Sequence, residues 1–242
     1  MEKIIYALWR GTGEERARFN DRLLGEVAAK LGEHAQGVRL NLQDADVAQG
    51  TSPRMTATQP QMDAVIQLWL PSANDAFRAP VDAVIGAASA RFAAWLACES
   101  TILPNTLHPP VPGKRTEGFS QIVFLGRPPR LTWDAWRDAW QRLHTAVAVD
   151  TQANFEYVQN LIVRPLTYGA PDYAAMVEEC FPHAALTDEA VYFDAVGDPA
   201  KCSENQRLMA ESCARFIDFD RIDCIPTSQF DVKTIVGRIA ER

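Results

Sequence analysis

The sequence contains no pair of cysteines spaced C-x-x-C, and its five cysteines are an odd number. A disulfide framework needs paired, regularly spaced cysteines, so we expect free thiols and a cytoplasmic protein. The four histidines show no H-x-H or H-x-x-x-H spacing, which would bring two imidazoles to one metal ion. The sequence therefore predicts neither disulfides nor a bound metal.

The chain also has fewer positively charged than negatively charged residues. The 242 residues include 24 Lys and Arg against 31 Asp and Glu, a formal net charge of -7. Nucleic acids and anionic membranes attract dense clusters of Lys and Arg, so neither is an expected partner. The longest apolar stretch, residues 81–97, is interrupted by Asp82 and Arg91, and we expect no signal peptide and no membrane-spanning helix. The expected partner is a small molecule.

Three well-known site motifs are missing as well. The chain has no G-x-G-x-x-G, no G-x-x-x-x-G-K-[ST] and no G-x-S-x-G. These motifs would indicate a dinucleotide fold, a phosphate-binding loop and a serine nucleophile, respectively. We therefore predict no cofactor.

What the first half does contain is a regular change of hydrophobic period. Apolar runs or alternation predict strands at residues 3–8, 38–42, 64–70 and 100–103. Apolar residues three or four positions apart predict helices over 13–31 and 74–95. A stretch rich in Thr, Ser and Pro, residues 49–59, predicts a loop. The resulting order is β-α-β-β-α-β.

The same order recurs after a proline-rich segment, whose residues 111–118 we interpret as a linker. Strands are predicted at 121–125, 155–163 and 191–196, and the last strand begins at 223–225. Long helices are predicted at 132–147, with Thr132 as N-cap, and at 202–217. A short helix at 172–180 and a tail helix at 232–239 complete the prediction.

This repetition predicts an α+β protein made of two ferredoxin-like βαββαβ repeats, residues 1–110 and 119–242. In each repeat both helices cover one face of a four-stranded sheet and leave the other face bare. Residues 155–163 carry apolar side chains on both faces, so the bare face needs a partner. We expect the two sheets to form one barrel within the chain; the alternative is two independent halves that each dimerise elsewhere.

The second half also carries a specific motif. A helix ends in W-x-x-x-H, Trp140 and His144, and the next strand reads Y-V-Q-N at residues 157–160. This resembles the EthD family of the dimeric α+β barrel group, over residues 120–230, whereas the first half is similar only in topology. Barrels of that group are usually built from two chains, so the resemblance implies a covalent pseudo-dimer.

The resemblance also bears on the number of sites and on the ligand. In the first half Asp21 and Gly25 stand where Trp140 and His144 stand in the second, which implies at most one site of this kind. EthD-like proteins belong to degradation and polyketide pathways. The family therefore implies a small, largely apolar cavity for an aromatic or enol-like ligand.

The candidate catalytic residues are His144, Tyr157 and Asn160. Neutral imidazole can take and return a proton near pH 7, and His144 lies at the edge of the apolar helix stripe, where partial burial would keep it neutral. Tyr157 and Asn160 are candidate donors to an oxyanion. Residues 157 and 160 face opposite sides of a regular strand, so one of them is expected to be structural. The alternative for each of the three is a structural role as a satisfied core polar group.

Aromatic residues near the motif are candidate ligand contacts, although this spacing is also typical of core packing. They are Trp136, Trp140 and Phe155. The leading hypothesis is a cofactor-independent lyase or isomerase, dehydratase-like, in which His144 moves a proton on an aromatic or cyclic keto or enol metabolite. The alternatives are a cofactor-free monooxygenase and a non-catalytic ligand-binding or accessory protein. Unpaired sheet edges would also permit a homodimer.

Overall fold

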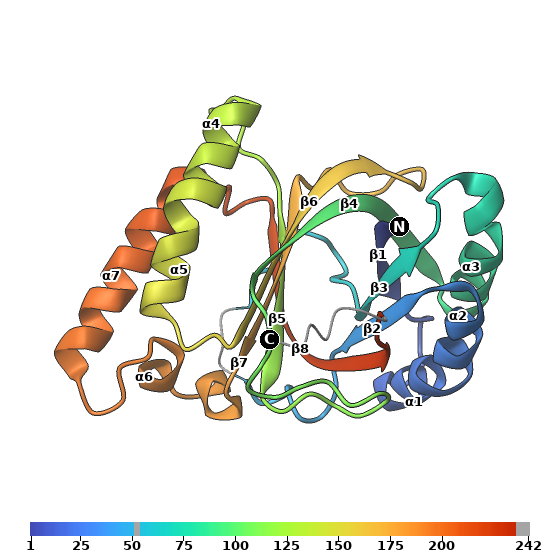
Figure 1. Cartoon of the computed structure of the whole chain (residues 1–242), viewed down its shortest axis with the longest axis horizontal. Coiled ribbons are helices and arrows are strands. Elements are labelled where there is room, and N and C mark those ends of the chain that lie inside the picture. Colours follow the sequence, from blue (N-terminus) through green and yellow to red (C-terminus); the bar gives the residue numbers. More distant parts are fainter. Residues whose placement is uncertain (51–53, 236–242) are drawn as a thin grey trace.

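The computed structural model describes residues 1–50 and 54–235, and its centre is a closed antiparallel barrel of eight strands. The strand order around the barrel is β1-β3-β2-β8-β5-β7-β6-β4 (Figure 1). The strands are β1 (Glu2–Trp9), β2 (Gly37–Leu42), β3 (Ala64–Leu70), β4 (Arg91–Leu103), β5 (Phe119–Leu125), β6 (Glu156–Pro165), β7 (Ala175–Phe181) and β8 (Ile222–Lys233).

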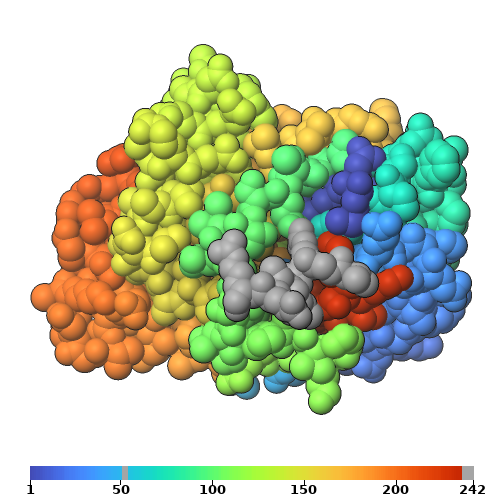
Figure 2. Space-filling model, viewed as in Figure 1, coloured from blue at the N-terminus to red at the C-terminus, as the bar shows by residue number. Residues whose placement is uncertain are grey.

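Helices cover the barrel on two opposite sides (Figures 1 and 2). On the first-half side these are α1 (Arg16–Arg22), a π-helical segment (Leu23–Val27), α2 (Ala28–His34) and α3 (Asp75–Ala88). On the second-half side they are α4 (Trp133–Arg137), a π-helical segment (Asp138–His144), α5 (Thr145–Thr151), a 3-10 turn (His183–Leu186), α6 (Glu189–Tyr192) and α7 (Pro199–Phe216).

The barrel closes by pairing strands from the two halves of the chain. Within the first half the order is β4-β1-β3-β2, and within the second it is β8-β5-β7-β6. The two closing pairs are β2 with β8 and β4 with β6. Each of the eight described strands thus has a neighbour on both sides, so this barrel leaves none of them an open edge for pairing between chains.

Strand alternation divides the buried residues between two environments. Ile4, Tyr6 and Leu8 of β1 pack with residues of α1 and α2, whereas the alternate residues Ile5 and Ala7 face the barrel interior. The interior cluster includes residues from both halves, such as Ile5 and Ile122. This shared core explains why apolar residues occupy both faces of the strands.

The helix expected at residues 74–95 is correct only in its first part. The helix α3 ends at Ala88, and Phe92 and Trp95 belong to the long strand β4. Trp95 pairs in register with Ile5 of β1 and lies inside the barrel. A run of apolar residues fits both the helix period and the strand period. Here pairing with β1 favours the strand.

Two further predictions in the second half are wrong. Residues 172–180 were expected to form a helix, but 175–181 form β7, which pairs with both β5 and β6. Residues 191–196 are predicted to form a strand, but residues 191 and 192 end the short helix α6 and residues 193–196 form turns and loop. The side chain of Asp188 caps this helix by accepting a hydrogen bond from the N–H of Ala190.

The last strand is longer than expected. β8 extends from Ile222 to Lys233, so Val232 and Lys233 are not helical as predicted. The remainder of the predicted tail helix, residues 236–239, lies outside the described residues. The predicted linker runs along β8, because the N–H groups of Gly113 and Thr116 donate to the carbonyls of Asp231 and Gln229, both at 2.9 Å.

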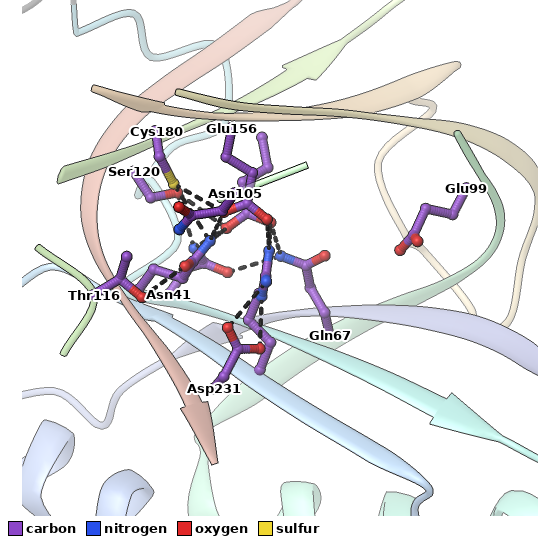
Figure 3. A network of polar contacts seen from close by, with 12 residues as sticks. Asn41, Gln67, Glu99, Asn105, Thr116, Ser120, Glu156, Cys180 and Asp231 are labelled. Atoms are coloured by element: carbon purple, nitrogen blue, oxygen red, sulfur yellow. Dashed lines mark hydrogen bonds and ion pairs between the residues drawn. The ribbon is translucent and has the colours of Figure 1, made fainter. Parts of the chain in front are cut away.

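A polar network fills part of the barrel interior (Figure 3). The Arg39 guanidinium of β2 contacts Asp231 at 3.0 Å, and Glu156 and Glu178 at 2.9 Å. Burial alone would raise the pKa of Glu178, but Arg39 and amide donors such as Gln229 lower it to about 2. The network joins β2 of the first half to β6, β7 and β8 of the second.

Candidate functional site

A pocket of about 360 Å³ lies between the sheet and the helices of the second half. Its floor is formed by side chains of β5, β6, β7 and β8 on the helix-facing side of the barrel, and its walls come mainly from the π-helical segment 138–144 and α7. Most lining residues are apolar, as in cavities that bind small aromatic ligands. In the first half the corresponding layer is filled by core residues that include Phe19, Leu23 and Leu31.

The helix that carries His144 is built from ordinary sequence signals. The side chain of Thr132 caps its start by accepting a hydrogen bond from the N–H of Ala135 at 3.2 Å. Trp136 and Trp140 then bury one face, with their ring centroids 5.0 Å apart. The helix widens to a π-helical turn at 138–144, and such turns are frequent at functional sites. His144 is the last residue of this turn and lines the pocket.

His144 is held between the two helices of this layer. Its Nδ1 lies 3.0 Å from Ser212 Oγ on α7, and its ring lies 4.7 Å from the ring of Phe216. Burial lowers the pKa of His144 to about 4, so the imidazole is neutral at pH 7, as expected from its place on the helix.

Glu179 places a carboxyl group on the pocket floor. It lies on β7, directly opposite Gln121 of β5 and Tyr157 of β6. Asn154 donates a hydrogen bond to it at 3.2 Å. Burial nevertheless raises the pKa of Glu179 to about 7, because few groups replace the water that an ionised carboxylate would need.

Other polar groups gather around Glu179. Gln121 and Gln152 both donate to the hydroxyl of Tyr192, at 3.2 and 2.9 Å. The hydroxyl of Tyr157 accepts a hydrogen bond from Gln159 at 2.8 Å. The pocket thus has one polar region on an otherwise apolar surface, an arrangement that can bind and orient a ligand with a single oxygen-bearing edge.

Three of the six predicted site residues line this pocket. His144, Tyr157 and Trp140 line it, whereas Asn160, Trp136 and Phe155 do not. Asn160 points into the barrel interior, where its Nδ2 lies 3.9 Å from Met176 Sδ, as strand alternation requires. Trp136 donates from Nε1 to the carbonyl of Phe216, and Phe155 packs against the ring of His108.

Glu179 and Met55 are among the pocket-lining residues that the sequence pattern does not indicate. Glu179 was missed because its segment was assigned to a helix; as a strand, alternation with Val177 places it on the helix-facing side. Met55 comes from the loop between β2 and β3 of the first half, and no local pattern marks it.

Within residues 1–50 and 54–235, no group of three or more His, Cys, Asp or Glu side chains is placed to hold a metal ion. No helix in the described part of the chain combines the length and apolar character needed to cross a bilayer.

A family model matches part of the second half of the chain. Residues 128–220 match the family model of the EthD domain. This interval contains the helix with His144, the strand with Tyr157, and Glu179. No curated protein matches the sequence significantly.

A solved structure shares the fold at low sequence identity. The crystal structure of an anthrone oxidase-like protein is 10% identical, with a TM-score of 0.57, and the match covers 99% of this chain and 96% of that one. A dye-decolorizing peroxidase from Bacteroides thetaiotaomicron is 12% identical, with a TM-score of 0.47 and coverage of 97% and 93%. At 10% identity, the likeness to the anthrone oxidase-like structure supports a shared fold alone.

Proposed function

We propose, with the EthD domain at residues 128–220 as premise, that the second half is a small-molecule enzyme that moves a proton on an aromatic or cyclic keto or enol ligand. The observation that carries the proposal is a buried carboxyl group, Glu179, whose pKa is raised to about 7 on the floor of an apolar pocket. Perturbed acids in apolar clefts are common at catalytic sites, and a base with a pKa near the working pH transfers protons most effectively.

The proposed reaction begins with ionised Glu179. Its carboxylate takes a proton from the carbon beside the ligand carbonyl, and the C–H electron pair becomes an enolate. Tyr157, oriented by the hydrogen bond from Gln159, donates to the enolate oxygen. Return of the proton to a different carbon completes an isomerisation, whereas expulsion of a protonated leaving group such as water completes a lyase reaction.

In this proposal His144 is not the base, although the sequence pattern favours that role for it. With its pKa lowered to about 4, the imidazole is a weaker base than the Glu179 carboxylate. One ring nitrogen is engaged with Ser212, which fixes the ring and leaves the other nitrogen for the ligand. We assign neutral His144 to a hydrogen bond with a ligand oxygen from the helix wall, opposite the carboxylate on the sheet.

Deuterium exchange tests the proposal without knowledge of the natural substrate. The probe is 2-tetralone, a bicyclic enolisable ketone, and the readout is deuterium incorporation from D₂O by mass spectrometry. The protein is expected to accelerate exchange above the buffer rate. Glu179→Gln keeps the shape of the side chain and removes the base, so kcat/KM should fall by about 100-fold or more.

Exposed residues supply the controls. His183→Gln and Glu33→Gln replace the same residue types outside the pocket and should leave the exchange rate unchanged. If the wild-type protein gave no acceleration, or if folded Glu179→Gln gave the wild-type rate, the proposed function would be wrong. Binding of 2-tetralone without exchange would instead indicate a ligand-binding or accessory protein.

Oxygen uptake separates the proposed isomerase or lyase from a cofactor-free monooxygenase. Both begin with the same enolate, but only the monooxygenase consumes O₂. If the protein forms its product at the full rate when oxygen is excluded, the proton-transfer reaction is supported. If the protein forms product only when oxygen is present, that reaction is contradicted. The shared fold does not choose between them.

We further propose that the chain is two copies of one module, residues 1–110 and 119–242, joined by a linker at 111–118. Support comes from the matching strand orders of the halves and from a π-helical segment in the first helical region of each, Leu23–Val27 and Asp138–His144. Gly25 takes the place of His144 in the first copy. The proposal accordingly assigns one site to each chain.

A further inference from the structure

A loop of the first half reaches the pocket of the second half. We call residues 54–62, which lie between β2 and β3, the strap. The N–H of Met55 donates to the carbonyl of Cys224 at 3.2 Å, and the N–H of Cys224 donates back at 2.9 Å. β2 pairs with β8 only between Ser228 and Lys233, so Met55 occupies the edge of β8 beyond that pairing. From there Met55 contributes to the pocket lining beside Cys224.

The strap is anchored on the other face of β8. Gln61 donates from Nε2 to the carbonyl of Met55 at 2.6 Å and to Asp223 Oδ1 at 3.1 Å. The N–H of Thr58 donates to Asp223 Oδ2 at 3.1 Å, and the Thr58 hydroxyl lies 2.6 Å from that of Tyr173. Asp223 is fully buried.

The residues that hold the strap in place are separate from the residues that line the pocket. Asp223, Thr58, Gln61 and Tyr173 are absent from the pocket lining, so the groups that fix the position of Met55 lie apart from the ligand space. A methionine side chain is flexible and polarisable and packs well against flat aromatic surfaces. A change in the length of this side chain therefore changes the space that a ligand has beside Cys224.

We propose that the strap makes Met55 a specificity-determining residue, which limits the size of the flat apolar ligand in the second-half pocket. The proposal rests on the proposed function only in taking this pocket as the ligand site. It also assigns a role to the first half, which supplies a wall for the site while its own helix layer is packed with core residues.

Binding of two fluorescent probes of different size tests the proposal. The probes are 2-naphthol and 1-hydroxypyrene, titrated against the whole chain. Met55→Ala should shift the ratio of the two Kd values about tenfold in favour of 1-hydroxypyrene, and Met55→Trp should shift it about tenfold in the opposite direction. Met55→Leu, of similar volume, should keep the wild-type ratio.

A second variant tests the anchor without changing the lining. Gln61→Met removes the hydrogen bonds to Met55 and Asp223, so the ratio should move in the same direction as with Met55→Ala, by a smaller factor. Gln36→Met makes the same substitution at an exposed position and should have no effect.

The outcomes distinguish this proposal from the proposed function. If both probes bind and their Kd ratio is the same in wild type, Met55→Ala and Met55→Trp, the strap proposal is overturned and the pocket remains a ligand site. If neither probe binds the wild-type protein, the pocket is not a site for flat apolar ligands. In that case both the strap proposal and the proposed function are wrong.

Discussion

At the scale of single residues, the pKa values of Glu179 and His144 are both shifted toward the neutral form, and by the same cause. Burial raises the pKa of the acid to about 7 and lowers that of the base to about 4, because each would lose hydration on ionising. The two residues face the pocket from opposite layers, the sheet and the helices. The pocket is thus an environment in which ionisation is costly, and in which a proton can be transferred near pH 7.

The raised pKa of Glu179 predicts a pH-dependent stability. Between the ordinary value of 4.5 and about 7, the folded state keeps a proton that the unfolded state has released, so the free energy of unfolding decreases as pH rises. A difference of about 2.5 pKa units corresponds to about 3 kcal/mol. Glu179→Gln should therefore gain up to about 3 kcal/mol relative to wild type between about pH 4 and about pH 8, measured by urea unfolding.

Glu33→Gln is the matched control for that measurement, because it removes an exposed carboxylate from α2. Its stability curve should run parallel to that of wild type over the same pH range. A Glu179→Gln curve that also ran parallel would contradict the burial of an ionisable acid in the pocket.

At the scale of elements, the sequence correctly predicts the helices and strands whose hydrophobic residues follow a single clear period. β1, β3 and the helix with His144 are long or strongly periodic, and their positions agree with the prediction. β7 and the first part of β4 were assigned to helices because short apolar runs fit both periods, and pairing partners distant in sequence decide their conformation.

The candidate site could be predicted to the same extent. The motif located His144, Trp140 and Tyr157 around one cavity, and strand alternation correctly separated Asn160 from Tyr157. Glu179 could not be recognised as a pocket residue, because the sequence pattern predicts a helix where β7 lies. Met55 could not be found from local pattern, because it reaches the pocket only through the pairing of the strap with β8.

The start of β5 offers a prediction about an element boundary. Gly118 has a φ of +88°, and a Cβ there would lie 2.1 Å from the carbonyl oxygen of Phe181 at the end of β7. Gly118→Ala should cost more than about 2 kcal/mol, because backbone strain and this contact add. Gly113→Ala, at φ +73° with nothing within 4 Å, should cost only about 1 kcal/mol of strain. Thermal unfolding of the two variants compares them, and equal losses would contradict the close contact.

At the scale of the whole molecule, the barrel is one structure rather than two attached halves. Its closing pairs, β2 with β8 and β4 with β6, join strands from different halves, and the interior core is shared. The buried network around Arg39 crosses the same boundary. The halves should therefore unfold together.

Arg39→Met tests this joining. It leaves Glu156, Glu178 and Asp231 without their common cation, so the free energy of unfolding should fall by about 3–5 kcal/mol. Arg142→Met breaks only an exposed pair with Asp138 on one helix and should leave the free energy of unfolding close to the wild-type value. The unfolding of Arg39→Met should remain a single transition by circular dichroism and by tryptophan fluorescence. A loss confined to one half would contradict a shared core.

The most direct test of the account is the pH dependence of kcat/KM for deuterium exchange into 2-tetralone. With Glu179 as the base, the wild-type value rises with pH and levels off above about pH 7, and this limb is absent in Glu179→Gln. The same limb in both proteins, with both folded and both binding the ketone, would contradict the assignment of proton transfer to this carboxyl group.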